Sequence, residues 1–118
     1  MSTEARAVAR SVSMSARKVR LVVDQIRGMS VNEAYAVLKF SKKAAAEPVS
    51  KTLHSAVANA QYRAQEAGDM LDVDDLYVSS AYVDEGATLR RWRAAAMGRA
   101  TPRRRRTSHI TIVVDTKE

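Results

Sequence analysis

Arginine is concentrated in one short stretch, RRWRAAAMGRATPRRRR, which runs from residue 90 to residue 106. The planar guanidinium group is permanently charged and binds phosphate or carboxylate oxygens in pairs. The stretch has no acidic residue of its own that could neutralise this charge. Its chemistry is therefore the binding of a polyanion, by Arg90, Arg91, Arg93, Arg99, Arg103, Arg104, Arg105 and Arg106.

The rest of the chain is nearly neutral. The 118 residues include 20 lysines and arginines against 13 acidic residues. Residues 86–106 contain eight of the basic residues and no acidic one, which leaves 12 basic and 13 acidic residues elsewhere. Charge confined to one segment indicates a polyanionic partner, whereas charge spread over a whole surface mainly affects solubility. The use of arginine in this stretch also favours stacking on exposed bases.

Residues that commonly carry catalysis or bind metals are few and scattered. His54 has no ligand at metal-binding spacing, so we expect it to pack on a helix, whereas His109 either touches phosphate or packs against a sheet. Asp72, Asp74 and Asp75 lack the glycine and terminal glutamate of a calcium loop and predict a solvated turn. No phosphate-binding loop, dinucleotide fingerprint or nucleophile motif is present. We expect neither an enzyme nor a metal or cofactor.

Composition also predicts the compartment. The chain has no cysteine, which excludes disulfides and thiolate metal sites. Its start, MSTEARAVAR, lacks the apolar run of a secretory signal. No stretch approaches the ~20 apolar residues of a membrane span. We expect a cytoplasmic protein with no membrane partner.

The segments on either side of the arginine-rich stretch have the composition of β-strands. Residues 76–83 and residues 107–114 are rich in β-branched and aromatic residues. Residues 5–12 alternate weakly and predict an edge strand. Strict alternation along it places two valines and two arginines on one face: Val8, Val12, Arg6 and Arg10.

Two helices are predicted between residues 13 and 40. Ser15 or Ser13 caps the first, and Gly28 ends it where a left-handed residue is favoured. Ser30 and Glu33 form a capping box at the start of the second, which ends near Phe40. Apolar residues at helical spacing form the buried stripes: Val19, Val22, Val23 and Ile26 in the first, and Ala34, Val37 and Leu38 in the second.

The longest predicted helix runs from Ser41 to about Ala67. Pro48 lies inside this range, where a proline removes a backbone hydrogen bond and clashes with the preceding turn. We expect either a kink at Pro48 or a helix that restarts near Glu47. Its buried stripe is Val49, Leu53, Val57, Ala60 and Ala64, flanked by Ala45 and Ala56.

These elements predict an α+β fold in which three helices pack on a small antiparallel three-stranded sheet. Because a structureless loop of about 20 residues is unusual in so small a domain, we expect a long protruding β-hairpin instead. The chain is then a single domain, 1–118, with a globular body formed by residues 1–85 and 107–118. The hairpin arm covers about 86–106, and Met97-Gly98 is the candidate for its tip.

Three alternatives remain for the arm beside RNA binding. It could be a solvated basic loop, but its position between two strands argues against this. A membrane-surface segment needs a broad apolar face, which the arm lacks. An architectural DNA-binding protein can use a basic β-arm in the minor groove, and composition alone does not separate RNA from DNA. Such proteins usually dimerise, and the sequence offers no large apolar dimer surface, so we expect no homo-oligomer.

Three segments together resemble the L-twenty-two family of large-subunit ribosomal proteins, in its bacterial form. They are SARKVRLVVDQIRG (15–28), KKAAAEPVSKTLHSAVANA (42–60) and VDEGATLRRWRAAAMGRATPRRRRTSHITIVV (83–114). The resemblance implies a structural constituent of the large ribosomal subunit. It also implies a body on the subunit surface near the exit of the nascent-chain tunnel, with a hairpin threaded inward through several domains of ribosomal RNA. The family supports early subunit assembly, contacts neighbouring ribosomal proteins, and meets the nascent chain and macrolide antibiotics near the hairpin tip.

Carried over by position, the resemblance divides the arm. Leu89, Arg90 and Arg91 match the family's tunnel-side residues, and Trp92 and Met97 are expected to face the tunnel or nearby bases. We expect Arg103 to Arg106 to anchor the base of the arm in ribosomal RNA, and Arg90, Arg91, Arg93 and Arg99 to hold its distal half. Residues matching the family's hairpin base, and two cations of the body, complete the predicted RNA-binding set: Thr107, Ser108 and His109, with Arg17 and Lys18.

Overall fold

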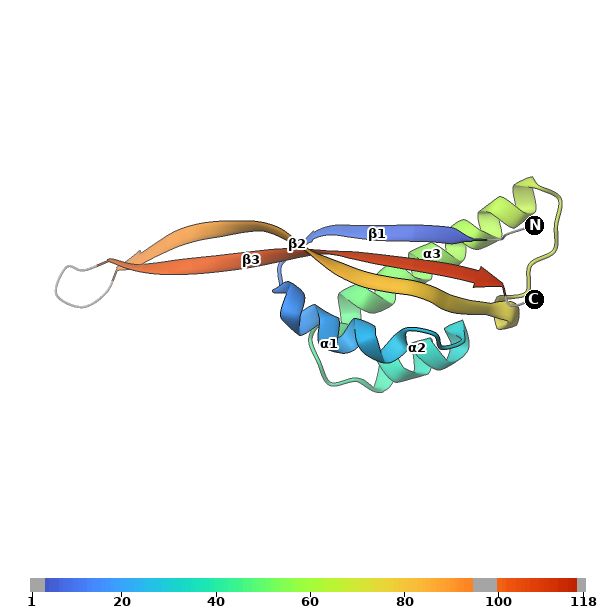
Figure 1. Ribbon diagram of the computed structural model, residues 1–118, viewed down its shortest axis with the longest axis horizontal. Coiled ribbons are helices and arrows are strands. Elements are labelled where there is room, and N and C mark those ends of the chain that lie inside the picture. Colours follow the sequence, from blue (N-terminus) through green and yellow to red (C-terminus); the bar gives the residue numbers. More distant parts are fainter. Residues whose placement is uncertain (1–3, 95–99, 117–118) are drawn as a thin grey trace.

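The described residues fold into three α-helices, one short 3-10 helix and three strands (Figure 1). The computed structural model describes the backbone of residues 4–94 and 100–116, and the side chains of residues 4–88 and 106–116. The elements follow in the order β1 (Ala5–Val12), α1 (Ala16–Ile26), α2 (Val31–Phe40), α3 (Ala46–Glu66), the 3-10 helix η1 (Val73–Asp75), β2 (Leu76–Ala94) and β3 (Ala100–Thr116).

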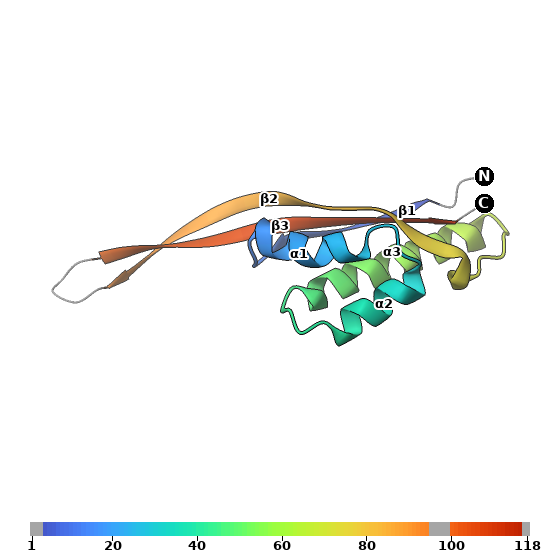
Figure 2. The ribbon, with the colours of Figure 1, turned by 60° about the horizontal axis from the view of Figure 1, so that its bottom comes forward.

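The three strands form one antiparallel sheet in the order β1-β3-β2. All three helices lie under one face of this sheet, and no described element covers the other face (Figure 2). Beyond the end of β1, β2 and β3 continue as a two-stranded hairpin that makes the molecule 67 Å long but only 27 and 15 Å across (Figure 1). The predicted α+β fold and its protruding hairpin are confirmed.

The core lies between the helices and the covered face of the sheet. The predicted stripe of α1, from Val19 to Ile26, is fully buried, as are Val49 and Leu53 of α3. These side chains meet alternate residues of the central strand β3, since successive strand residues point to opposite faces. The β3 residues concerned are Ile110, Ile112 and Val114, all at 0% exposure.

The two predicted helix starts are capped as expected. The Ser15 hydroxyl accepts the N–H of Lys18 at 3.4 Å, and the Ser30 hydroxyl accepts the N–H of Glu33 at 3.3 Å. Each bond satisfies a backbone donor that the first turn of a helix leaves unpaired. Gly28 has φ of 83°, the left-handed conformation predicted for it after α1.

The long helix begins later than predicted. It starts at Ala46, not at Ser41, which instead ends α2 and donates its N–H to the carbonyl of Leu38. Pro48 is thus the third residue of α3, in the first turn, where an N–H has no intrahelical partner to lose. The first full-turn bond, from Val49 N to Ala45 O at 3.2 Å, follows directly after it. The expected restart near Glu47 is therefore what occurs.

The outward face of β1 also differs from strict alternation. Ser11 adopts a left-handed conformation, with φ of 56°, and the register with β3 shifts between Ala9 and Val12. An extra residue in one strand reverses the direction of the side chains that follow it. Val12 consequently packs against the core, while Val8 stays on the exposed face.

Helix side chains satisfy the outer edge of β2 within the body. The Arg20 guanidinium donates to the carbonyl of Val83 at 2.8 and 3.2 Å, and that of Arg27 to the carbonyl of Ala81 at 2.7 and 3.1 Å. An edge strand leaves these carbonyls without a ladder partner, so Arg20 of α1 and Arg27, directly after α1, supply the missing donors.

The outer edge of β1 is satisfied in the same way from α3. Asn59 donates its side-chain N–H to the carbonyl of Arg6 at 2.9 Å, and Arg63 donates to the carbonyl of Glu4 at 2.8 Å. The body thus has helix side chains bonded along both sheet edges.

Candidate nucleic-acid interface

The hairpin arm, residues 86–106, places arginine opposite arginine. Its strands pair in register from Thr88↔Arg106 to Ala94↔Ala100, whereas β1 reaches only as far as the Val12↔Ser108 pair. Within this ladder, two pairs of partners are both arginine: Arg90↔Arg104 and Arg91↔Arg103. Like charges directly opposite on neighbouring strands destabilise a hairpin. The arm is therefore a structure that gains stability when anions bind along it.

A β-bulge marks the point where the arm leaves the body. The register moves from Glu85↔Ser108 to Thr88↔Arg106, so Gly86 and Ala87 share the single opposing residue Thr107. The Thr107 hydroxyl donates to the carbonyl of Ala87 at 2.6 Å. A Cβ at Gly86 would lie only 2.5 Å from the Thr107 oxygen, so this close approach requires glycine.

The His109 ring lies across the same junction. Its Nδ1 accepts the N–H of Ser11 in β1 at 2.9 Å, and its Nε2 would lie 3.1 Å from a Cβ built on Gly86 of β2. Because Nδ1 is the acceptor, the proton of the neutral ring is on Nε2. His109 on the central strand therefore packs between β1 and the start of the arm.

The three residues predicted at the hairpin base, Thr107, Ser108 and His109, thus lie together with Ser11 and Gly86. We call these five residues the root. Ser108 faces the core at 0% exposure, and its hydroxyl has no hydrogen-bond partner among the described residues. Thr107 and His109 make their hydrogen bonds within the protein. Direct RNA contact by these three side chains stays a prediction; what the geometry provides is support for the arm.

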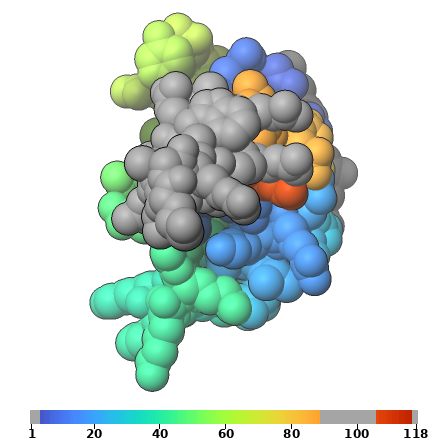
Figure 3. All heavy atoms as spheres, turned by 90° about the vertical axis from the view of Figure 1, so that its left-hand side faces the viewer, coloured from blue at the N-terminus to red at the C-terminus, as the bar shows by residue number. Residues whose placement is uncertain are grey.

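The end of the body from which the arm projects carries further cations. Arg17 and Lys18 are exposed at the start of α1, and Lys42 and Lys43 are exposed in the connection between α2 and α3. Viewed toward this end, the beginning of α1 (blue) and the end of α2 with its connection (teal to green) lie next to each other (Figure 3). These two lysines were not among the predicted contacts, because a lysine pair in a loop carries no motif.

Arginine on α1 does not form a uniform phosphate-binding surface. The sequence placed Arg17, Lys18, Arg20 and Asp24 together on the outside of this helix. In the structure the Arg20 guanidinium instead bonds the carbonyl of Val83 at the sheet edge. The side chains of Arg17 and Lys18 make no hydrogen bond or ion pair within the described part of the chain.

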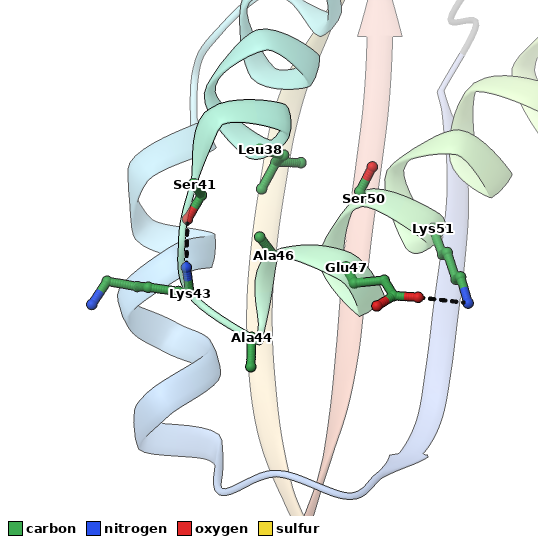
Figure 4. A pocket seen from close by; sticks show the side chains of 8 residues that line it. All are labelled: Leu38, Ser41, Lys43, Ala44, Ala46, Glu47, Ser50 and Lys51. Carbon is green, nitrogen blue, oxygen red and sulfur yellow. Dashed lines mark hydrogen bonds and ion pairs between the residues drawn. The ribbon is translucent and has the colours of Figure 1, made fainter.

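A shallow hollow of about 440 Å³ lies between the end of α2 and the start of α3 (Figure 4). Its one carboxylate, Glu47, pairs with Lys51 at 3.4 Å, and no histidine or cysteine lines it. Without a nucleophile next to a base, the hollow provides no catalytic arrangement. The lining residues are Leu38, Ser41, Lys43, Ala44, Ala46, Glu47, Ser50 and Lys51.

The remaining candidates for chemistry have structural roles. His54 stacks on Tyr35 with ring centroids 4.3 Å apart, and burial raises the pKa of the Tyr35 hydroxyl above its usual value. Asp72 caps η1 through the N–H of Asp74, in an exposed turn as predicted. Among residues 4–94 and 100–116, no group of three or more potential ligands could hold a metal ion, and no helix has the length and apolarity to cross a membrane.

Part of the predicted site has only a described backbone. Leu89, Trp92 and the distal arginines up to Arg93 lie in β2, and Arg103 to Arg105 lie in β3. The predicted tip, Met97-Gly98, and Arg99 lie outside the described residues.

Comparison with known proteins accounts for this architecture. The family model described as "Ribosomal protein L22p/L17e" matches residues 7–115, body and arm together. A relative from Bifidobacterium longum, named "Large ribosomal subunit protein uL22", is 54% identical over 115 residues, which cover 98% of this chain and 97% of the relative. Relatives of the same name from Desulfitobacterium hafniense and Ligilactobacillus salivarius are 53% and 52% identical, each over 98% of this chain and 96% of their own length. The chain therefore belongs to the ribosomal protein L22p/L17e family.

Proposed function

We propose that this protein is a structural component of the large ribosomal subunit that is held in place by ribosomal RNA along its arm. The observation that carries the proposal is the register of the arm, in which Arg90 faces Arg104 and Arg91 faces Arg103. Four arginines so placed, with no carboxylate in residues 86–106, need an external polyanion. Phosphate groups supply that charge, and guanidinium groups bind them in pairs.

The body adds contacts from the end that carries the arm. Arg17 and Lys18 are exposed beside the arm and lack partners among the described residues, so they are available for phosphates of the same RNA. Thr107, Ser108 and His109 support this binding by fixing the direction in which the arm leaves the sheet. Neighbouring ribosomal proteins complete the surroundings of the body.

The distal part of the arm is assigned to the nascent-chain exit tunnel. In this assignment Leu89, Arg90, Arg91, Trp92 and Met97 face the lumen or the bases that line it. The protein then contributes to subunit assembly by linking RNA domains, and its tip meets the nascent chain and macrolides. Support comes from family membership and from the length of the paired arm, which reaches Ala94↔Ala100 beyond the body.

Sedimentation of cell lysates tests the proposal. We expect the protein to co-sediment with the large subunit at moderate salt, and Arg103→Gln/Arg104→Gln to move it toward the free fraction. Lys39→Gln/Lys51→Gln is the matched control, since it removes the same charge from exposed helix positions. A wild-type protein that sediments free of the subunit contradicts the proposal, and equal losses in both variants would show that only total charge matters.

Binding to ribosomal RNA fragments gives a second readout. If eight arginines neutralise eight phosphates, the log–log dependence of affinity on salt has a slope of about −6 to −7. A comparable affinity for duplex DNA of arbitrary sequence would favour the architectural DNA alternative, which no observation on the fold supports.

A further inference from the structure

The face of the sheet that points away from the helices is not covered by any described element (Figure 2). Outward residues of the three strands lie in register across it, and the central row is Val8↔Thr111↔Tyr82. Val8 is 40% exposed and Tyr82 is 43% exposed, while Thr111 between them is buried at 4%. A solvated sheet face normally carries polar residues, so a half-exposed aromatic ring and a half-exposed valine on either side of a buried threonine call for a partner.

Two arginines of β1 flank this row, and the carboxylates on this face, Asp84 and Asp115, belong to the other two strands. Arg6, opposite Val113, lies on this face two residues before Val8, and Arg10 lies two residues after Val8 at the start of the bulge, about 13 Å from Arg6 along an extended strand. Both are exposed, and neither guanidinium makes a hydrogen bond or ion pair with a described residue. The exposed carboxylate of Asp84 lies at the opposite edge, on β2. The positive half of the face is therefore the half along β1.

We propose that this open face is a second RNA-binding surface, which takes an unpaired segment with one base stacked on Tyr82 and its phosphates at Arg6 and Arg10. Sheet faces with exposed aromatic rings stack single-stranded bases, and stacking needs no particular base. Tyr82 and the β1 arginines are separated by two strand spacings, about 10 Å, so one nucleotide can span the base and phosphate positions. The inference rests on the proposed ribosomal function and adds a site away from the arm arginines.

Two features favour RNA over a protein partner. Only Val8 and Tyr82 are large exposed apolar residues on this face, whereas a stable protein interface buries about 800 Å² on each side. In addition, β2 and β3 run without a break from this face into the arm, as Leu76–Ala94 and Ala100–Thr116. RNA that follows the arm toward the body therefore arrives beside the open face.

Photo-cross-linking in assembled large subunits tests the proposal. A benzophenone side chain is placed at position 82, with position 62 on α3 as the exposed-tyrosine control and position 88 in the arm as the positive control. We expect RNA adducts at positions 82 and 88 and at least fivefold fewer at position 62. A protein adduct or no RNA adduct at position 82, with RNA at 88, overturns this inference alone. Absence of RNA at both positions refutes the proposed function as well.

The roles of the individual residues are tested by the salt dependence of decauridine binding to the full-length protein. Each phosphate contact to a single strand contributes about 0.7 to the log–log slope, so Arg6→Gln/Arg10→Gln should reduce it by about 1.4. Lys39→Gln removes an exposed charge from α2 and should leave the slope unchanged. Tyr82→Ser should weaken binding at least fivefold, with Tyr62→Ser as its control. Equal effects of target and control variants, with circular dichroism unchanged, overturn the proposal.

Discussion

The substitution Gly86→Ala tests the close packing at the root of the arm. The added methyl group would lie 2.5 Å from Thr107 Oγ1 and 3.1 and 3.2 Å from Nε2 and Cε1 of His109. The Thr107 hydroxyl cannot rotate away freely, because it is held by a 2.6 Å hydrogen bond to the carbonyl of Ala87. Either that bond breaks, at about 0.5–1.5 kcal/mol, or the bulge shifts, at about 1–3 kcal/mol.

The expected net effect is a loss of about 1 kcal/mol in the free energy of unfolding. A gain of about 0.4–1 kcal/mol, from the lower entropy of alanine in the unfolded chain, offsets part of the clash. Urea denaturation of the full-length protein, followed by circular dichroism, measures the difference. A stability equal to or above that of the wild type would refute the close-approach argument.

A double-mutant cycle separates volume from hydrogen bonding at this position. Thr107→Ala removes both the bond and the crowding atom, so Gly86→Ala/Thr107→Ala should cost less than the sum of the two single changes. Thr107→Val removes the bond but keeps the volume, and should give no such relief. Gly28→Ala is the backbone control: its φ is 83° with open space around it, so Thr107→Ala should not rescue it. Equal rescue by alanine and valine would show that crowding is not the cause.

Two further substitutions test the sheet edge and the start of α3. Arg27→Met should lower the free energy of unfolding by about 1.5–3 kcal/mol, because the carbonyl of Ala81 loses a charged donor. Lys39→Met, at an exposed position, is the control. Equal losses in the two variants would contradict the role of Arg27 at the sheet edge. Pro48→Ala should change it by less than about 1 kcal/mol, because a proline in the first helical turn removes no backbone bond. A gain of ~3 kcal/mol in the free energy of unfolding would show instead that Pro48 lies in a strained helix interior.

The sequence predicted most of the body because its local signals agree with one another. Ser15 and Ser30 stand directly before apolar residues at helical spacing, and both cap helices. The run from Thr107 to Val114 predicts a strand because β-branched residues dominate it, and its even-numbered residues fill the core. Such elements depend on neighbours within a few residues, which the sequence displays.

Two predictions were wrong because tertiary structure determines the outcome: the start of α3 and the face of β1 on which Val12 lies. Ser41 is a good helix start by type, but it serves as the end of α2, and α3 begins at Ala46 without a side-chain cap. Val12 departs from simple alternation because Ser11 adds a bulge that only pairing with β3 reveals.

In the candidate site, too, composition revealed some features and only the tertiary structure revealed the others. Charge counting identified the arm, because clustering of arginine is a property of composition. It could not show that Arg20 belongs to the sheet edge, since hydrogen bonding to Val83 spans 63 positions of the chain. Nor could it show the pairing of Arg90 with Arg104, which depends on the bulge at Gly86. The hydrogen bond from Ser11 to the His109 ring likewise depends on the pairing of β1 with β3, because it spans 98 positions of the chain.

The hydrogen bonds along the two sheet edges affect how readily the protein aggregates before it binds its partner. Unpaired strand edges are templates for aggregation, and Arg20, Arg27, Asn59 and Arg63 occupy the carbonyls that would recruit another chain to the body. Beyond the root, β2 and β3 have only each other, so self-association by strand addition is open mainly along the arm. There a second copy would align arginines with arginines. The arginines that we propose bind phosphate would therefore also act as gatekeepers against strand addition in the newly made protein.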